Sequence, residues 1–267
     1  MLRTRIITAA VLVAVLLAVV LWLPPLATSV ALTLVVLAGA WEWSAFLRAP
    51  PRLVRALYVA AVAALLPVIW QLAATPAGTA TVLAIAVLWW IVALLWVIFA
   101  PRRAARWSAA IAGVLALVPA WLALMRLRLA MPRGAEWLLF VLMLVWVADI
   151  GAFFVGRRFG RMRLAPEVSP GKTWEGVLGG IAVSALVALA GSGWFGVAPI
   201  LFVPLCLVAV GFSVVGDLTE SLLKRYAGMK DSGTLFPGHG GVMDRIDSVT
   251  SAAPILVFGL IAFGVRT

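Results

Sequence analysis

The chain has 267 residues, of which 65% are hydrophobic and 12% are charged, and its formal net charge is +11. A mean hydropathy of +1.15 and several apolar runs longer than about 18 residues exclude a soluble globular domain and predict a polytopic membrane protein. Arginine and lysine in excess are typical of residues that orient membrane helices against anionic lipid. The charge therefore needs no nucleic acid partner.

Nine apolar segments are long enough to predict transmembrane helices in an all-α fold, and short breaks rich in Pro and Gly separate them. In chain order they are about 6–23, 27–47, 54–74, 79–99, 107–125, 136–156, 174–194, 197–217 and 248–265. The first follows Arg3 and Arg5 as a signal peptide would. Its apolar run is longer than the roughly 7–15 residues of a signal h-region, so we expect a retained helix.

The basic residues predict the orientation of these helices. With the N-terminus in the cytoplasm, 17 of the 21 lysines and arginines fall in cytoplasmic segments. The remaining four are Arg126, Arg128, Arg133 and Arg266. Because cytoplasmic loops are enriched in Lys and Arg, this bias favours that orientation. We expect a multi-pass protein of the cell inner (plasma) membrane, with its function where two long cytoplasmic loops, about 157–173 and about 218–247, meet.

The polar segment 217–247 is a candidate site, because charge is costly at a membrane. Within it, the spacing i, i+3, i+4, i+7 relates Asp217, Glu220, Ser221 and Lys224. These four side chains share one face if the eighth helix continues past the membrane. That face could hold a cation beside a phosphate, or it could be a solvated helix end with ion pairs.

Glycines and further charges follow in the same segment. The glycines are Gly228, Gly233, Gly238, Gly240 and Gly241. They let backbone amides approach a ligand and form anion-binding nests, unless the loop is merely flexible. Asp244, Arg245 and Asp247 then precede the last span, and carboxylates interleaved with bases suit a Mg²⁺-bound polyphosphate. A single histidine, His239, cannot build a zinc site; an acid, a base, a phosphate donor and a structural residue all stay open for it.

The earlier loop holds two further candidates. Asp149 lies inside an apolar run, where an unpaired carboxylate would be expensive. Residues 169–176 read SPGKTWEG, but the two-glycine Walker spacing is absent and we predict no strand ahead of it, so a P-loop is excluded. A phosphate contact by Gly171 and Lys172 remains reasonable, since the N-terminus of the seventh helix favours anions.

These blocks together resemble one known family. The chain reads SLLKR from Ser221, then KDSG, then PGHGGVMDRID ending at Asp247, and DIGAFF and SPGKTWEG lie upstream. Over roughly 145–250 the pattern is similar to the signature of the phosphatidate cytidylyltransferases, also called CDP-diacylglycerol synthases. Residues before 130 match only as generic spans. We therefore expect a scaffold over 1–130 and a catalytic region over 131–267, with site segments 149–176 and 217–247.

The resemblance implies a transferase of phospholipid biosynthesis that joins CTP and phosphatidic acid to give CDP-diacylglycerol and pyrophosphate. It also implies Mg²⁺, with room for a second cation, and a homodimer in the lipid bilayer. The implied metal ligands are Asp149, Asp217, Asp244 and Asp247. The implied catalytic residues are Asp217, Lys224, Lys230, Asp231, Asp244, Arg245 and Asp247. The implied substrate-binding residues are Ser169, Lys172, Ser221, Arg225, His239, Gly240 and Gly241.

Two other functions stay open at the level of sequence. A CTP-dependent kinase of a polyprenol or phytol would need a base to activate a neutral hydroxyl. A lipid phosphate is already an anionic nucleophile and needs only charge neutralisation and in-line positioning. A transporter would be expected to have discontinuous helices and inverted repeats near the midplane, whereas the charges here concentrate at one face.

Overall fold

The computed structural model describes residues 2–48, 50–233, 235 and 240–265. Within these ranges the helices are α1 (Leu2–Leu21), α2 (Pro25–Trp43), α3 (Arg52–Leu72), α4 (Pro76–Phe99), α5 (Arg106–Leu129), α6 (Gly134–Phe159), α7 (Trp174–Phe195), α8 (Pro199–Tyr226) and α9 (Met243–Ala262). A 3₁₀ helix, η1 (Ser44–Leu47), continues α2, and two strands, β1 (Arg163–Ala165) and β2 (Ser169–Thr173), precede α7.

The predicted polytopic helical fold is confirmed. In the described part of the chain, eight helices are long and apolar enough to cross a membrane, and α1 contributes a shorter apolar stretch, Ala10–Leu21. The predicted ends need correction at the site. α8 continues to Tyr226, well past the expected end at 217, as the charged face required. α9 already begins at Met243, so Asp244 and Asp247 lie in its first two turns and do not precede it.

A β-hairpin is the departure from an all-helical fold within the described ranges. β1 and β2 are antiparallel, with Arg163 opposite Thr173 and Ala165 opposite Ser169. We predicted no strand ahead of SPGKT, and this prediction is wrong, because β1 precedes it and SPGKT itself forms β2. The strand leads directly into α7, whose first turn is capped by the Thr173 side chain, which accepts a hydrogen bond from Gly176 N at 3.2 Å.

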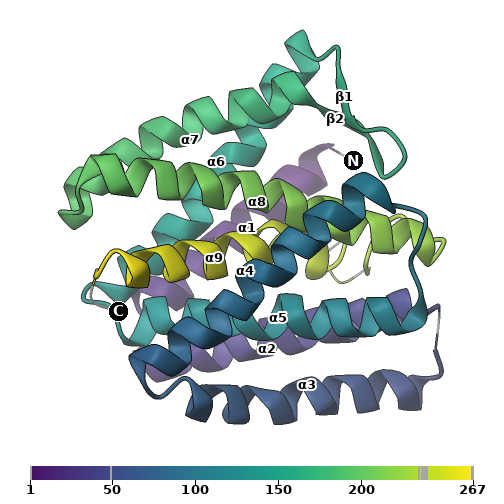
Figure 1. Ribbon diagram of the computed structural model, residues 1–267, viewed down its shortest axis with the longest axis horizontal. Helices are drawn as coiled ribbons and strands as arrows, with labels where there is room; N and C mark the ends of the chain where they lie inside the picture. The colour runs from purple at the N-terminus through teal and green to yellow at the C-terminus, as the bar shows by residue number, and fades with distance from the viewer. Residues whose placement is uncertain (1, 49, 234, 236–239, 266–267) are drawn as a thin grey trace.

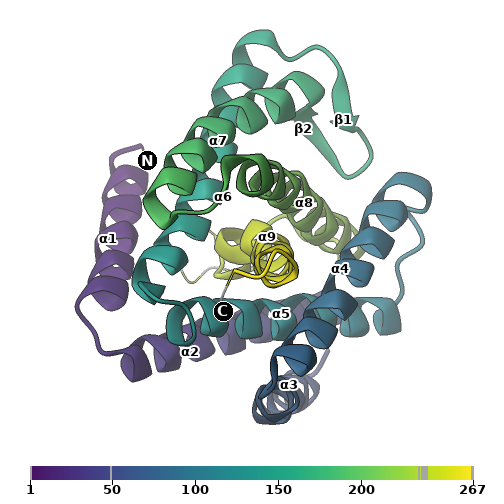
Figure 2. The ribbon, with the colours of Figure 1, turned by 60° about the vertical axis from the view of Figure 1, so that its left-hand side comes forward.

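Helix α9 lies in the middle of the bundle, with α4, α5 and α8 packed around it (Figures 1 and 2). Small and hydroxyl side chains allow this close packing, and Ser251 Oγ of α9 donates to the carbonyl of Phe212 in α8 at 2.7 Å. Gly216 of α8 faces Ser251, and a Cβ at this glycine would collide with the Ser251 hydroxyl. The site ends of α8 and α9 are therefore held close together.

Helices α6 and α7 also approach closely, through a row of small residues. Gly176, Gly180, Ser184 and Ala188 recur every four residues on the buried side of α7. A Cβ at Gly180 would lie 2.6 Å from the Ala148 carbonyl oxygen, and one at Gly176 would lie 2.9 Å from that of Ala152. Because small residues let membrane helices meet backbone to backbone, the start of α7 is fixed beside the charged end of α6.

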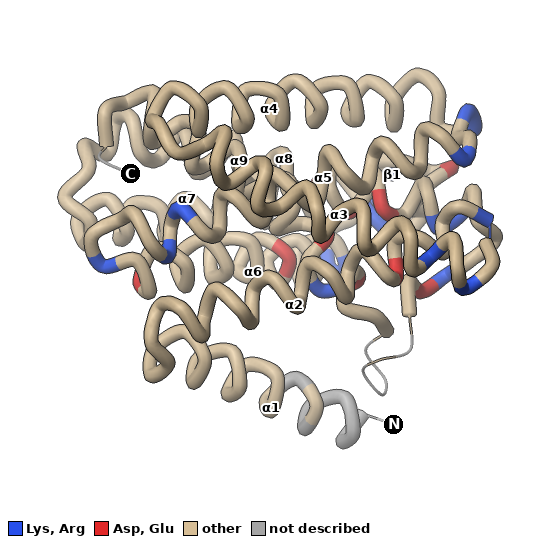
Figure 3. The backbone as a smooth tube through the Cα atoms, turned by 90° about the horizontal axis from the view of Figure 1, so that it is seen from below, with Lys and Arg blue, Asp and Glu red and all other residues tan. Residues whose placement is uncertain are grey.

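Charged residues gather toward the end of the molecule that carries β1 (Figure 3). A smaller group lies at the opposite end, and uncharged residues make up most of the tube between them. This distribution is what a membrane-spanning bundle requires, because charge inside a bilayer is expensive. It also separates one charge-rich end, where the candidate site lies, from the rest of the bundle.

Candidate functional site

A cavity of about 390 Å³ opens at the charge-rich end, between α6, β2, α7 and α8. Its size is within the range of roughly 300–1,000 Å³ that is typical of small-molecule sites. The polar residues that line it include Asp149, Arg157, Lys172, Thr173 and Asp217, and Phe153, Val210 and Val214 add apolar surface. The cavity thus offers charge and an apolar wall together.

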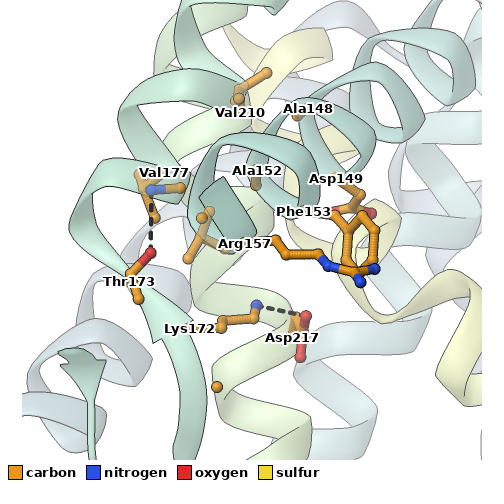
Figure 4. Close-up of a pocket in the computed structure, with 15 residues that line it drawn as sticks. Ala148, Asp149, Ala152, Phe153, Arg157, Lys172, Thr173, Val177, Val210 and Asp217 are labelled. Atoms are coloured by element: carbon orange, nitrogen blue, oxygen red, sulfur yellow. Dashed lines mark hydrogen bonds and ion pairs between the residues drawn. The ribbon is translucent and has the colours of Figure 1, made fainter. Parts of the chain in front are cut away.

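Two of the predicted residues face each other across this cavity. Lys172 of β2 forms an ion pair with Asp217 of α8 (Figure 4). Their side chains are 25% and 28% exposed, so solvent still reaches the pair. Ser221 Oγ donates to the other Asp217 oxygen at 3.3 Å. The two predicted site segments, far apart in the sequence, therefore meet through this ion pair.

A second charged group lies one to two turns further along α8. Lys224 Nζ lies 2.5 Å from Glu220 Oε2 and 2.8 Å from Asp244 Oδ1. All three side chains are at most 12% exposed. Apart from this ion pair, neither oxygen of Glu220 has a hydrogen-bond partner among the described residues. The predicted shared face of α8 is thus confirmed, and it is a buried ion-pair cluster, not a solvated helix end.

Backbone amides complete the surroundings of Asp244. Gly241 N donates to Asp244 Oδ2 at 2.7 Å, and Ser232 N donates to the same oxygen at 3.1 Å. Gly240 has a φ of +79°, a conformation that favours glycine, and its Cα lies against the Asp244 carboxylate. Two backbone amides of this segment thus converge on one oxygen, but they come from Ser232 and Gly241 and not from successive residues. The anion that they bind in this structure is a carboxylate of the chain itself.

Asp247 is a further acid at the start of α9. It lies one turn after Asp244 in α9 and accepts a hydrogen bond from Ser248 N at 2.7 Å. The charges of Asp217, Glu220 and Lys172 all act on it. Arg245, exposed on the same turn, acts in turn on Asp149 of α6. The start of α9 therefore brings charge to both the cavity and the Lys224 cluster.

Other predicted residues lie further out. Arg225, Lys230 and Asp231 are exposed, and none of them is among the described residues that line the 390 Å³ cavity. Ser169 begins β2, three residues before Lys172. His239 and Gly238 lie outside the described residues. The roles assigned to these residues stay predictions.

Two residues that reasoning from sequence missed also belong to the site. Arg157 in the last turn of α6 lines the cavity, although its position among the cytoplasmic bases suggested only an orienting charge. Glu42 of α2 is buried and accepts hydrogen bonds from Ser232 Oγ at 3.1 Å and Met243 N at 2.8 Å. A carboxylate within an apolar run, the signal used for Asp149, would have identified Glu42 as well.

The acidic residues can be compared with what a divalent cation needs. Within the described residues, no three His, Cys, Asp or Glu side chains form a group that could hold a metal ion. The four predicted aspartates thus do not form one ready-made site there. Mg²⁺ commonly binds through one or two carboxylates together with water and substrate phosphates. Asp149 and Asp217 both line the cavity, so the donor set fits Mg²⁺ that arrives with a nucleotide.

Comparisons with known proteins identify the family of the chain. Residues 3–263 match the sequence profile of the Cytidylyltransferase family. A phosphatidate cytidylyltransferase of Pseudomonas aeruginosa is 42% identical to this chain, and the alignment covers 99% of this chain and 98% of the relative. One from Haemophilus influenzae is 38% identical over 97% and 98% of the two chains. One from Bacillus subtilis is 42% identical over 49% of each. Since the family profile and two of these relatives match almost the whole chain, the chain belongs to the cytidylyltransferase family.

Proposed function

We propose that the protein transfers a cytidylyl group from CTP to phosphatidic acid, giving CDP-diacylglycerol and pyrophosphate. The observation that carries the proposal is the cavity at the charge-rich end of a membrane bundle, where Lys172 and Asp217 face each other beside apolar side chains. A lipid phosphate and a nucleotide must meet at such a boundary, because one substrate is anchored in the bilayer and the other is dissolved in water.

The reaction needs little covalent help from the protein. An oxygen of the lipid phosphate forms a bond to the α-phosphorus of CTP, and the bond from that phosphorus to the bridging oxygen of the β-phosphate breaks. Pyrophosphate carries away the electron pair. Because the nucleophile is already anionic near neutral pH, charge neutralisation and in-line positioning supply most of the catalysis. An array of Lys, Arg and Asp suits that task.

The ion pair of Lys172 with Asp217 supports a binding role for both residues. Opening a salt bridge normally leaves two uncompensated charges. A magnesium-bound phosphate offers a cation for Asp217 and an anion for Lys172, so both charges stay compensated. Bound Mg²⁺ would neutralise phosphate charge, with Asp217 and Asp149 as its protein ligands. Arg157 lines the cavity and could contact a further phosphate oxygen.

The cavity also supports the proposed division of the chain. Every described residue that lines it belongs to the region 131–267, which we propose carries the reacting groups. We place the charge-rich end in the cytoplasm and the protein in the inner membrane, because the positive-inside bias favours that side. By resemblance to the family, the protein would work as a homodimer.

We expect pyrophosphate release from CTP by the purified protein only when phosphatidic acid and Mg²⁺ are both present, with CDP-diacylglycerol as the lipid product. Removal of the divalent cation with EDTA should stop turnover, and added Mg²⁺ should restore it, because the phosphate charge must be neutralised. Chromatography of the lipid product identifies the reaction. A phosphorylated polyprenol and CDP would indicate the kinase instead, and the absence of any CTP turnover would contradict both enzymes.

Single cysteines test the proposed orientation. In a Cys206→Ala background, Gly171→Cys and Leu235→Cys should react with a membrane-impermeant maleimide only in inside-out vesicles. Gly171 has open space around its Cα, and Leu235 is 61% exposed. Pro132→Cys, an exposed position between α5 and α6, is the matched control and should react only in right-side-out vesicles. Labelling with the opposite pattern would show that the proposed orientation is wrong.

A further inference from the structure

A carboxylate from the N-terminal half of the chain reaches the second charged group. Glu42 lies in the last turn of α2 and is 7% exposed. One of its oxygens, Oε2, accepts hydrogen bonds both from Ser232 Oγ at 3.1 Å and from Met243 N at 2.8 Å. Ser232 lies within the loop that leads from α8 to α9, and Met243 is the first residue after that loop. Glu42 therefore binds the loop at an interior residue and at its α9 end.

The bond to Met243 also stabilises the start of α9. Met243 is the first residue of that helix, and no side chain of the preceding residue caps it. The first amides of a helix have no partner inside the helix, and a negative charge beside them is favourable. Here the carboxylate comes from another helix. Gly39, one turn earlier in α2, permits the approach, because a Cβ there would already lie 3.1 Å from Met243 Sδ.

Two glycines of the loop pack directly against the Glu42 carboxylate. A Cβ at Gly233 would collide with Glu42 Oε1, and one at Gly241 would collide with both Glu42 Oε2 and Ser232 Oγ. Neither glycine has a positive φ among those recorded, so close approach, not backbone conformation, explains why a side chain is excluded. The glycine pattern of the loop thus reflects a buried contact with α2 as well as any contact with substrate.

The same contact continues to Asp244. Ser232 Oγ, while donating to Glu42, accepts a hydrogen bond from Asp244 N at 3.3 Å, and Ser232 N donates to the Asp244 carboxylate at 3.1 Å. The end of α2 is itself anchored: Trp43 Nε1 donates to Ala109 O of α5 at 2.8 Å, and Arg48 stacks on the Tyr226 ring at the end of α8. The segment that carries Glu42 is therefore held by contacts with both α5 and α8.

We propose that Glu42 is a positioning residue for this enzyme: through Ser232 and the start of α9 it fixes the Asp244 carboxylate and the loop between α8 and α9 in the geometry that turnover requires. This role rests on the proposed cytidylyl transfer. Neither Glu42 nor its hydrogen-bond partners Ser232 and Met243 are among the described residues that line the 390 Å³ cavity, so its effect is exerted through other residues.

The test compares two replacements of nearly the same size. Glu42→Gln keeps an oxygen acceptor at the position of Oε2, whereas Glu42→Met fills the space without an acceptor. We expect the Met variant to lose at least about thirtyfold in kcat with a change in KM for CTP below about threefold, and the Gln variant to stay within about threefold of the parent in both, since lost positioning acts on the transition state more than on ground-state binding.

Glu136→Met is the matched control. Like Glu42, Glu136 accepts a hydrogen bond, in this case from Trp194 Nε1 at 2.7 Å, and it forms an ion pair with Arg133. It lies in the first turn of α6, at the end of that helix away from the site. Its loss should leave kcat and KM unchanged. Ser232→Ala provides a second route, because it removes the link between Glu42 and Asp244 and leaves the bond from Glu42 to Met243. We expect it to lower kcat about tenfold.

A readout without turnover separates this inference from the proposed function. In limited digestion with trypsin in detergent, we expect the Glu42→Met variant to be cut after Arg225 or Lys230 at least about tenfold faster than the parent. Cutting after Arg102 and Arg103 should not change, because the substitution loosens only the loop between α8 and α9. Parental protein without CTP turnover would contradict the proposed function, while faster cutting would still support the contact. An active parent, with Glu42→Met and Ser232→Ala both parental in kinetics and in digestion, would overturn the inference.

Discussion

Replacement of Asp244 by Asn is expected to lower kcat by about a thousandfold or more while the protein stays folded in the membrane, since removal of a charge that acts in the transition state costs several kcal/mol and each 1.36 kcal/mol is about tenfold in rate. Three donors converge on this carboxylate: Lys224 Nζ at 2.8 Å, Gly241 N at 2.7 Å and Ser232 N at 3.1 Å. An amide has the same size, but its NH₂ group would face at least one of these donors.

The loss of the Asp244 charge also changes the ion pairing of Lys224. Lys224 is shared between Asp244 and Glu220, so the Asn variant leaves one acid for one base in a group that is almost fully buried. Steady-state kinetics at saturating CTP, with the amount of protein in the membrane measured in parallel, provide the test. Glu167→Gln is the control, because this exposed glutamate pairs only with Arg102 among the ion pairs of the described residues. Activity of the Asn variant within about tenfold of the parent would remove Asp244 from the catalytic group.

Local periodicity explains why the charged face of α8 could be predicted, although the end of the helix was placed too early. The spacing of Asp217, Glu220 and Lys224 places these side chains on one face of any helix that includes them, and the structure has the ion pair of Glu220 and Lys224 on that face. Apolar length likewise predicted the membrane helices, since a bilayer sets a minimum span. Both inferences need only residues that are close in sequence.

Long-range contacts explain what the sequence could not reveal. Glu42 and Ser232 are 190 residues apart, and their hydrogen bond depends on how α2 packs against α9. The glycines at 233 and 241 suggested ligand binding, yet part of their role is to admit this carboxylate. Strand β2 was missed for a related reason: its pairing with β1, not its own Pro and Gly content, makes it extended.

Lys172→Ala is expected to lower kcat/KM for CTP by about a hundredfold, comparable to the loss of one preorganised donor to a developing negative charge. The structure provides the reason: Lys172 lies on β2 against Asp217 in the cavity, whereas a base that only orients the protein would need no such partner. Removal of Lys172 also leaves Asp217 without its ion-pair partner, so the phosphate contact and the orientation of the Asp217 carboxylate are lost together. The split between kcat and KM shows whether the contact strengthens in the transition state.

Lys172→Arg distinguishes the two roles of this residue. An orienting charge tolerates the exchange, because Arg keeps the positive charge, but a compact ammonium in a confined site is not replaced well by a planar guanidinium. We therefore expect Lys172→Arg to recover membrane topology in full and activity only in part. Arg52→Ala, which removes an exposed base at the start of α3, is the control and should keep parental kinetics. If Lys172→Ala kept the parental kcat and KM for both CTP and phosphatidic acid, Lys172 would be an orienting charge, and the phosphate contact at the start of α7 would be wrong.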